Sequence, residues 1–130
     1  MQRTHHPDGT EVADFYVRAI RTGPFVFVSG TTSLDSAGNT QGATAAEQTR
    51  VTLAKIETAL GKSGATMYDL VRLTIFVTRI ADQAEVSAAL AKALPGPVTS
   101  TLVAVAALVK PDLLVEIEAT AVTTDPTARH

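Results

Sequence analysis

The chain has 130 residues, of which 11 are Lys or Arg, 13 are Asp or Glu and none is Cys. This length suits one hydrophobic core, so we expect a single domain over residues 1–130, with an ordered core from about residue 15 to 122 and flexible termini. The slightly negative net charge argues against nucleic acid as a partner, and the absence of Cys excludes disulfides and a cysteine nucleophile.

The histidines and the apolar runs restrict the chemistry and the location further. His5, His6 and His130 all stand in polar terminal segments, where an imidazole lacks the support that a general base or a metal ligand needs. We therefore expect no metal site. No apolar run approaches the ~20 residues of a membrane-spanning helix, and residues 1–10 are polar. This pattern favours a soluble, cytoplasmic protein without a membrane partner.

Two β-prone segments open the predicted core. Residues 15–22 alternate apolar and polar side chains, and residues 25–30 (FVFVSG) are rich in residues that favour strands. Gly23 and Pro24 between them predict a hairpin. The turn-forming residues that follow predict a loop over residues 31–42.

A helix and a third strand come next. Thr44 and Glu47 have the spacing of a capping box, which predicts the start of a helix, and Gly61 with Gly64 predicts its end. The apolar stripe of this helix predicts that the remaining polar positions mostly face water, namely Gln48, Arg50, Lys55 and Glu57. Residues 71–78 then alternate with the period of a strand.

The last part of the chain predicts one short helix and two strands. Asp82 and Glu85 repeat the capping spacing, and Pro95 follows the end of the helix that they predict. Residues 101–109 are almost entirely apolar, as expected of a strand that is buried on both faces. Residues 113–122 alternate again and predict the final strand.

The order ββαβαββ predicts an α+β domain with one mixed sheet. Right-handed crossovers place both helices on one face of that sheet. The other face keeps apolar side chains from several strands, and a soluble monomer rarely leaves such a surface in water. We therefore expect a homo-oligomer in which the open sheet faces meet.

Four segments, in their order along the chain, resemble one protein family. They are residues 23–30 (GPFVFVSG), residues 48–50 (QTR) with 55–56 (KI), residues 71–77 (VRLTIFV) and residues 115–119 (VEIEA). The chain is similar to the RidA family (YjgF-like, reactive intermediate deaminases) from about residue 16 to 122. The resemblance implies a chorismate-mutase-like fold and a homotrimeric barrel with small-molecule clefts between subunits.

The resemblance also implies a chemistry. Active RidA members hydrolyse enamines and imines to 2-keto acids and ammonia without a cofactor, so we expect no cofactor here. In that family an arginine in a P-x-R-[ST] element binds the substrate carboxylate. Residues 97–100 (PVTS) match this element, except that Thr99 replaces the arginine. Threonine cannot make the bidentate hydrogen bonds that an arginine makes to a carboxylate. The chain is therefore expected to be a divergent member of the family with weak activity on 2-imino acids.

The resemblance places candidate site residues on this chain. Glu116 matches the glutamate beside the catalytic water and is the expected catalytic residue. The expected substrate-binding residues are Tyr16, Ser29, Gly30, Thr31, Ser87, Thr99, Ser100 and Thr101. Ser87 is a second departure, because deaminating members often carry asparagine there. Arg18 and Arg72 are candidates to replace the missing arginine, although a solvated arginine on a strand is the commoner case.

Two functions remain open at this point. The first is a cofactor-free hydrolase or deaminase of reactive imine or enamine metabolites, with Glu116 as the acid or the water-orienting group. The second is a non-catalytic trimeric protein that binds a neutral or hydroxylated ligand in the same intersubunit cleft. Structural roles also stay open, since Glu116 suits a polar interface, Thr99 and Ser100 suit bonds to local backbone, and Gly30 suits close packing.

Overall fold

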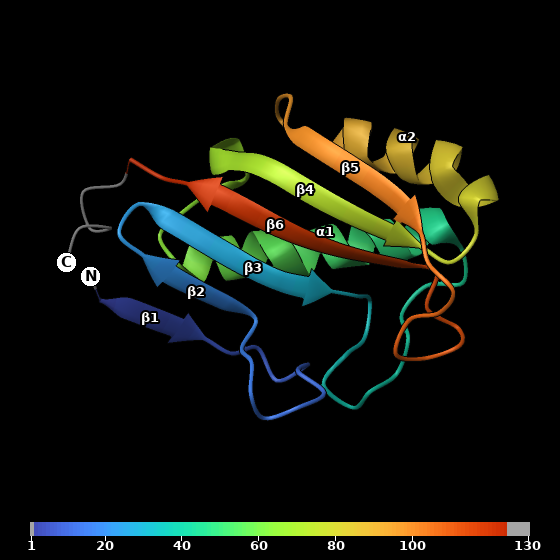
Figure 1. The fold of residues 1–130 in the computed structure, drawn as a ribbon, viewed down its shortest axis with the longest axis horizontal. Helices are drawn as coiled ribbons and strands as arrows, with labels where there is room; N and C mark the ends of the chain where they lie inside the picture. Colours follow the sequence, from blue (N-terminus) through green and yellow to red (C-terminus); the bar gives the residue numbers. More distant parts are fainter. Residues whose placement is uncertain (1, 125–130) are drawn as a thin grey trace.

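The computed structural model describes residues 2–124, which form one mixed sheet backed by helices (Figure 1). Within these residues the strands are β1 (Arg3–His6), β2 (Ala19–Thr22), β3 (Phe25–Thr31), β4 (Leu70–Val77), β5 (Thr99–Ala104) and β6 (Val115–Val122). The α-helices are α1 (Ala45–Lys62) and α2 (Gln83–Ala93), with 3-10 turns η1 (Met67–Asp69) and η2 (Ile80–Asp82). The strand order is β1-β2-β3-β6-β4-β5, and only β4 and β5 are parallel neighbours. This confirms the predicted α+β sheet with its two helices.

The hydrophobic core lies between the sheet and α1. Ile56 and Leu60 of α1 are buried there, and so are Ile75 of β4 and Ile117 of β6. Because side chains alternate along a strand, their neighbours in sequence point to the opposite face. That opposite face is turned toward the viewer in Figure 1, with α1 behind it. The alternation therefore decides which side chains remain available on the open face.

α1 begins where its capping residues predict, but its polar face differs from the prediction. Thr44 Oγ1 accepts a hydrogen bond from the Glu47 amide at 3.1 Å, which confirms the cap. Gln48 is only 1% exposed, because its side-chain amide bonds three backbone groups of the neighbouring loops. Lys55 is half-buried, with its amine on two backbone carbonyls. Loop backbone, rather than water, therefore satisfies these two polar side chains.

The sequence does not predict β1, and this strand corrects the expected flexible N-terminus. β1 pairs antiparallel with β2, so that His5 lies opposite Ile20 and His6 opposite Ala19. The two histidines are therefore held in the sheet, while His130 lies outside the described residues. β2 starts at Ala19 and not at residue 15, because residues 7–18 form an irregular segment between the paired strands.

β5 corrects the predicted strand over residues 101–109. It ends at Ala104 and pairs only with β4, at one edge of the sheet. Val103 is 40% exposed and Val109, in the loop that follows, is 59% exposed. An apolar run predicts that a segment is buried, but it does not predict which part of the protein buries it. Within residues 2–124 no further strand pairs with this edge of the sheet.

The start of α2 also differs from its predicted capping. Asp82 precedes the helix, but its carboxylate makes no capping hydrogen bond and instead pairs with Arg79 at 3.1 Å. A charged guanidinium three residues away competes successfully with the helix amides for this carboxylate. Glu85 accepts a hydrogen bond from the Ala46 amide at 2.8 Å, which ties α2 to the start of α1. No helix within residues 2–124 is long and apolar enough to cross a membrane.

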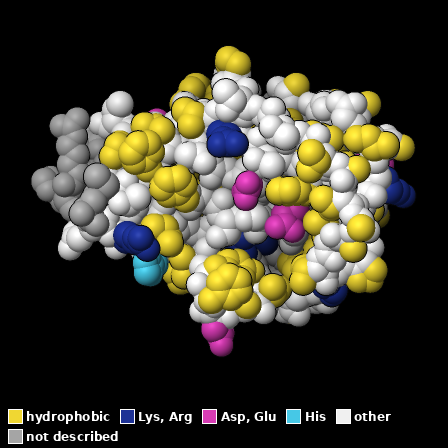
Figure 2. All heavy atoms as spheres, in the orientation of Figure 1, with side chains coloured by type: hydrophobic (Ala, Val, Ile, Leu, Met, Phe, Trp, Pro, Cys, Tyr) yellow, Lys and Arg dark blue, Asp and Glu magenta, His cyan; other side chains and the backbone are white. Residues whose placement is uncertain are grey.

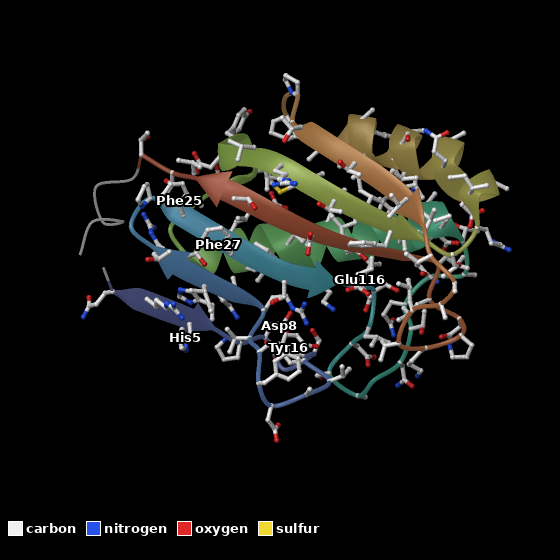
Figure 3. The ribbon with its side chains drawn as sticks, in the orientation of Figure 1. His5, Asp8, Tyr16, Phe25, Phe27 and Glu116 are labelled. Atoms are coloured by element: carbon white, nitrogen blue, oxygen red, sulfur yellow. The ribbon has the colours of Figure 1, made fainter. Side chains whose placement is uncertain are left out.

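The open face of the sheet carries the exposed apolar side chains that the alternation predicts. Phe25 and Phe27 of β3 stack with ring centroids 6.2 Å apart and are 42% and 48% exposed. Figure 2 shows hydrophobic patches across this face with acidic side chains between them, and Figure 3 places Phe25, Phe27 and Glu116 on it. The face therefore carries apolar side chains toward both of its ends and acidic side chains near its middle.

Candidate functional site

A small cleft of about 90 Å³ forms where β3 and β6 meet the segment before β2. β3 loses its regular register against β6 between Val28 and Thr31. Such an irregularity re-aims the backbone of a strand, and here it brings Gly30 beside Glu116. Tyr16, Arg18, Gly30 and Glu116 line the cleft together with Thr10, Val12, Thr32, Leu34 and Val109.

Glu116 lies directly against the backbone of Gly30. A Cβ atom at Gly30 would overlap Oε2 of the Glu116 carboxylate, so this approach requires a residue without a side chain. Burial raises the pKa of Glu116 above the ordinary value, the neighbouring charge of Glu118 raises it further, and Arg18 opposes both. The protonated form of this carboxyl is therefore more accessible than that of an ordinary glutamate.

Arg18 is buried and donates hydrogen bonds from all three of its side-chain nitrogens, which corrects the view that it is a solvated strand residue. Its Nε donates to Asp8 at 3.1 Å, with 3% of the arginine side chain exposed. One terminal nitrogen donates to the Gly30 carbonyl at 2.8 Å and to Thr31 Oγ1 at 3.1 Å. The other donates to Thr10 Oγ1 at 3.0 Å. This guanidinium fixes the segment before β2 onto β3, and these contacts leave it unsuited to clamp a substrate carboxylate.

Three further expected site residues lie beside this cleft, with hydroxyl groups that bond within the chain. Tyr16 Oη accepts a hydrogen bond from the Val12 amide at 2.9 Å, which leaves its own proton free to donate. Ser29 Oγ donates to the Val17 carbonyl at 2.7 Å. Thr31 is fully buried and donates to the Ser29 carbonyl at 2.7 Å. Ser29 and Thr31 therefore shape the β3 end, and Tyr16 has the freer hydroxyl.

The other expected site residues lie elsewhere in the same chain. Thr99 aligns with Arg72, whereas Glu116 aligns with Phe76 four residues further along β4. At about 3.3 Å per residue this separation is roughly 13 Å along the sheet. Thr99 Oγ1 donates to the Val71 carbonyl at 2.8 Å, as expected of a hydroxyl at the start of a strand.

Register also separates the remaining hydroxyl residues. Thr101 aligns with Thr74 on the open face, whereas Ser100 aligns with the buried Leu73 and so points toward the helical layer. Ser87 lies on α2, which packs against α1, and it accepts a hydrogen bond from Gln83 at 2.9 Å. Within one chain these residues therefore do not join Glu116 in a single site.

The segment before β2 contributes Thr10 and Val12 to the cleft, and two carboxylates that sequence reasoning misses hold this segment in place. Glu11 accepts hydrogen bonds from the amides of Asp8, Gly9 and Arg18. Burial alone would raise the pKa of Asp8, but the hydrogen bonds from Thr10 and the charge of Arg18 together outweigh burial and lower it. The turn-forming sequence PDGT was the available signal, since Asp and Gly favour such compact loops.

Comparison with known proteins identifies the family. The family model described as Endoribonuclease L-PSP matches residues 8–123 of this chain. The chain belongs to this YjgF/RidA family. Members of the family with solved structures include Rv2704 from Mycobacterium tuberculosis, described as a member of the YjgF/YER057c/UK114 family. It is 46% identical, covers 94% of this chain and 100% of its own, and superposes with a TM-score of 0.83.

Two more family structures agree. YyfA from Yersinia pestis, described as a Rid family protein of unknown function, is 27% identical with a TM-score of 0.85, and the match covers 94% of this chain and 100% of that one. The yjgF gene product of E. coli is 27% identical with a TM-score of 0.79 over 92% of this chain and 98% of its own. The mitochondrial protein mmf2 of Schizosaccharomyces pombe is 33% identical over 82 residues, which cover 63% of this chain and 64% of that protein, less than two thirds of its length.

Proposed function

We propose that this YjgF/RidA protein is a cofactor-free hydrolase of small imine or enamine metabolites, with Glu116 as its catalytic acid. The observation that carries the proposal is the half-buried Glu116 carboxyl, held against Gly30 with a raised pKa. A protonated carboxyl in a small cleft suits protonation of an imine nitrogen. The same group, once ionised, suits orientation of a water molecule.

The reaction needs few groups because imines are already prone to hydrolysis. Glu116 donates its proton to the imine nitrogen, and water then adds to the imine carbon while the carboxylate accepts a proton from that water. The resulting carbinolamine loses ammonia to give a carbonyl product. No electrons are gained or lost overall. Tyr16, whose phenol proton has no acceptor within residues 2–124, is the second donor of the cleft.

The charges around the cleft favour substrates that lack a carboxylate. Thr99 supplies no positive charge, and Arg18 is occupied by acceptors of the chain itself. Arg72 is exposed and aligned with Thr99 on the open face, with Glu118 in the same surface hollow. Of the two arginines considered as replacements for the family arginine, only Arg72 is exposed, and it shares its hollow with the carboxylate of Glu118, which opposes binding of a second carboxylate there.

We propose a homotrimer in which one copy completes the cleft of the next. The separation of Thr99 and Thr101 from Glu116 within one chain supports this assembly, because a cleft that uses both groups needs a second copy. The exposed Phe25 and Phe27 and the unpaired edge of β5 support it further, since apolar faces and strand edges favour association.

A non-catalytic binding role is the second candidate. The observation that favours it is the internal use of the hydroxyl groups of Ser29, Thr31 and Thr99, which leaves few polar groups beyond Glu116 and Tyr16 for catalysis. Saturable binding of a neutral ligand without product formation supports this role. Steady turnover of the same ligand contradicts it.

A coupled assay separates these possibilities. Freshly generated imines, with and without a carboxylate, are offered to the natural protein, to Thr99→Arg and to Glu116→Gln, with Glu57→Gln at an exposed position of α1 as the control. We expect turnover of neutral imines by the natural protein and by Glu57→Gln, loss in Glu116→Gln, and new activity on 2-imino acids in Thr99→Arg. Unchanged turnover in Glu116→Gln contradicts the catalytic role of this residue.

A further inference from the structure

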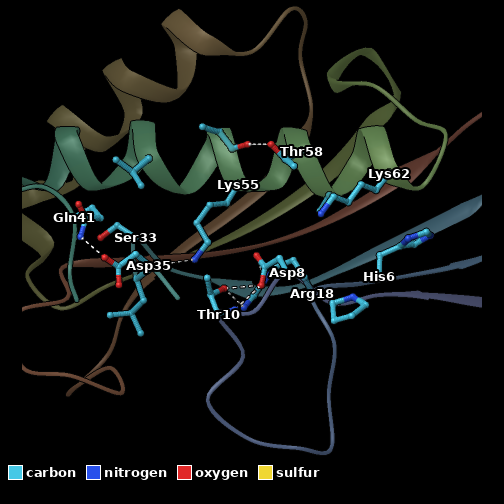
Figure 4. Close-up of a pocket in the computed structure, with 15 residues that line it drawn as sticks. His6, Asp8, Thr10, Arg18, Ser33, Asp35, Gln41, Lys55, Thr58 and Lys62 are labelled. Atoms are coloured by element: carbon cyan, nitrogen blue, oxygen red, sulfur yellow. Dashed lines mark hydrogen bonds and ion pairs between the residues drawn. The ribbon is translucent and has the colours of Figure 1, made fainter. Parts of the chain in front are cut away.

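A larger cavity of about 410 Å³ lies between α1 and the segment that joins β1 to β2 (Figure 4). Its charged wall consists of His6, Asp8, Arg18, Asp35, Lys55 and Lys62. Val51, Ala54 and Ala59 of α1 contribute to its apolar wall. Arg18 lines both this cavity and the Glu116 cleft, but Glu116 and Tyr16 do not reach the larger cavity. The two sites are therefore chemically distinct neighbours.

Lys55 presents an amine to this cavity in a fixed orientation. Its Nζ donates to the Thr32 carbonyl at 2.8 Å and to the Leu34 carbonyl at 2.7 Å. These are the hydrogen bonds of the amine within residues 2–124, and they use two of its tetrahedral directions. A neutral amine has two N–H groups and one lone pair. When both N–H groups donate to these carbonyls, the lone pair is left free to react. Figure 4 shows the side chain reaching from α1 into the space between Asp8 and Asp35.

The surroundings of Lys55 favour the neutral amine. Burial first, and then the positive charge of Arg18, lower the pKa of Lys55 to about 8, against the opposing charges of Asp8, Glu11 and Asp35. Those carboxylates are already engaged, since Asp8 binds Arg18 and both Glu11 and Asp35 accept from loop amides. None of them forms an ion pair with Lys55 in the described part of the chain. A large fraction of this amine is therefore unprotonated and nucleophilic near pH 8.

The other end of the cavity is positively charged. Lys62 lies seven residues after Lys55, two turns along α1 and about 10 Å away along the helix axis. Across residues 2–124 its amine has no hydrogen bond or ion pair. Burial, then the charge of Lys62, and then that of Arg21 lower the pKa of His6, which shows the positive field at this end. An anionic group of a ligand is favoured beside Lys62.

We propose that this cavity binds small carbonyl compounds that carry an anionic group and that Lys55 condenses with their aldehyde or keto carbon. The Nζ lone pair forms a bond to the carbonyl carbon, and the amine proton passes to the oxygen to give a carbinolamine. Loss of that oxygen as water, after protonation by solvent, leaves an iminium ion on Lys55. Amine, carbonyl and one proton thus give iminium and water without oxidation or reduction. The site is independent of the imine hydrolysis proposed for the Glu116 cleft.

Reductive trapping with 6-oxohexanoate tests the proposal on the full chain. This probe carries an aldehyde and a carboxylate at opposite ends of an extended carbon chain, so that one molecule can reach both Lys55 and Lys62. Sodium cyanoborohydride converts its iminium adduct into a stable secondary amine that peptide mass spectrometry locates. We expect Lys55 to be labelled about tenfold or more faster than the exposed Lys92 at pH 8, because an ordinary lysine is almost fully protonated there. Hexanal, which has the same chain length but lacks the acid, is expected to show a smaller preference for Lys55, and Lys62→Met is expected to slow labelling by 6-oxohexanoate.

The labelling rates test the reactive lysine and the anionic subsite separately. Labelling of Lys55 no faster than that of Lys92 overturns the reactive lysine, and equal preference with hexanal overturns the anionic subsite. Lys55→Arg keeps a positive charge and N–H donors, so retention of its melting temperature together with loss of the fast adduct supports the assignment. Glu116→Gln is expected to leave the labelling of Lys55 unchanged, which separates this site from imine hydrolysis in the cleft.

Discussion

The Glu116 carboxylate occupies the space that a side chain at position 30 would fill, because Gly30 has no Cβ atom. The backbone of Gly30 does not adopt the left-handed conformation that favours glycine, so close approach and not turn geometry requires this residue. The missing side chain at Gly30 thus allows the candidate catalytic acid to occupy its position, so a change at either residue is expected to affect the same carboxyl group.

Gly30→Ala is expected to lower turnover of a neutral imine by about 10- to 100-fold, because the carboxyl must leave its position for proton transfer. The free energy of unfolding is expected to change by less than about 1 kcal/mol, since the displaced atom is the end of a flexible side chain. Steady-state kinetics and urea denaturation measure the two quantities.

The control is Gly61→Ala, because a Cβ atom there meets nothing within 4 Å. This substitution within α1 is expected to stabilise the protein by about 0.5–1 kcal/mol without changing turnover. The double variant Gly30→Ala/Glu116→Gln is expected to be no slower than Glu116→Gln alone. Additive losses of turnover would show that Gly30 acts independently of Glu116.

Glu116→Gln is expected to increase the free energy of unfolding at pH 7. Burial raises the pKa of Glu116 in the folded protein above that of the unfolded chain. The folded state therefore binds more protons than the unfolded state between these two pKa values, and the stability of the natural protein falls as the pH rises through this window. Urea denaturation at fixed protein concentration measures the gain, which is expected to vanish below the ordinary pKa of glutamate. A gain that persists there would point to packing instead.

Arg18→Met is expected to cost about 2–3 kcal/mol of stability, because it leaves Asp8 and the Gly30 carbonyl without their buried donor. The same change removes a positive charge that lowers the pKa values of both Glu116 and Lys55, so both are expected to rise. NMR titration of the two side chains measures these shifts. Arg50→Met, at an exposed position of α1, is the control and is expected to change neither pKa.

Phe27→Glu is expected to convert the proposed trimer into monomers, because it places a charge in the apolar part of the open face beside Phe25. Equilibrium sedimentation at micromolar concentration measures the mass. Ile80→Glu, at a 62% exposed position in η2 outside the sheet, is expected to leave the mass unchanged. A natural protein that is monomeric under these conditions would exclude the assembly.

Local sequence signals predicted the elements that depend on local contacts. The cap at Thr44 and the alternation of residues 71–78 and 113–122 each specify an element through neighbours close in the chain. The predicted strand over residues 101–109 was wrong in its bounds and its burial, since β5 spans Thr99–Ala104. A run of apolar residues indicates that a segment is buried, but it does not indicate whether the same chain or another subunit buries it. β1 was missed because its polar sequence gains its order from pairing with β2.

The candidate site could be predicted only in part. The family resemblance indicated Glu116, Gly30 and Tyr16, which the structure brings into one cleft. It gave no signal for the burial of Arg18, because that burial depends on acceptors contributed by Asp8 and Thr10 from an irregular segment. Lys55 was assigned to the solvent face of α1 for the same reason, since the carbonyls that bind it belong to a loop.

The position of β6 has a consequence for how the protein folds. β6 comes last among the described strands along the chain, yet it lies in the middle of the sheet between β3 and β4. During synthesis β3 and β4 therefore wait with exposed edges until residues up to Val122 have emerged, and the contacts that join them span much of the sequence. Such non-local pairing slows folding and prolongs exposure to aggregation. We expect chains that stop before Val115 to be captured by chaperones rather than to form a smaller stable domain.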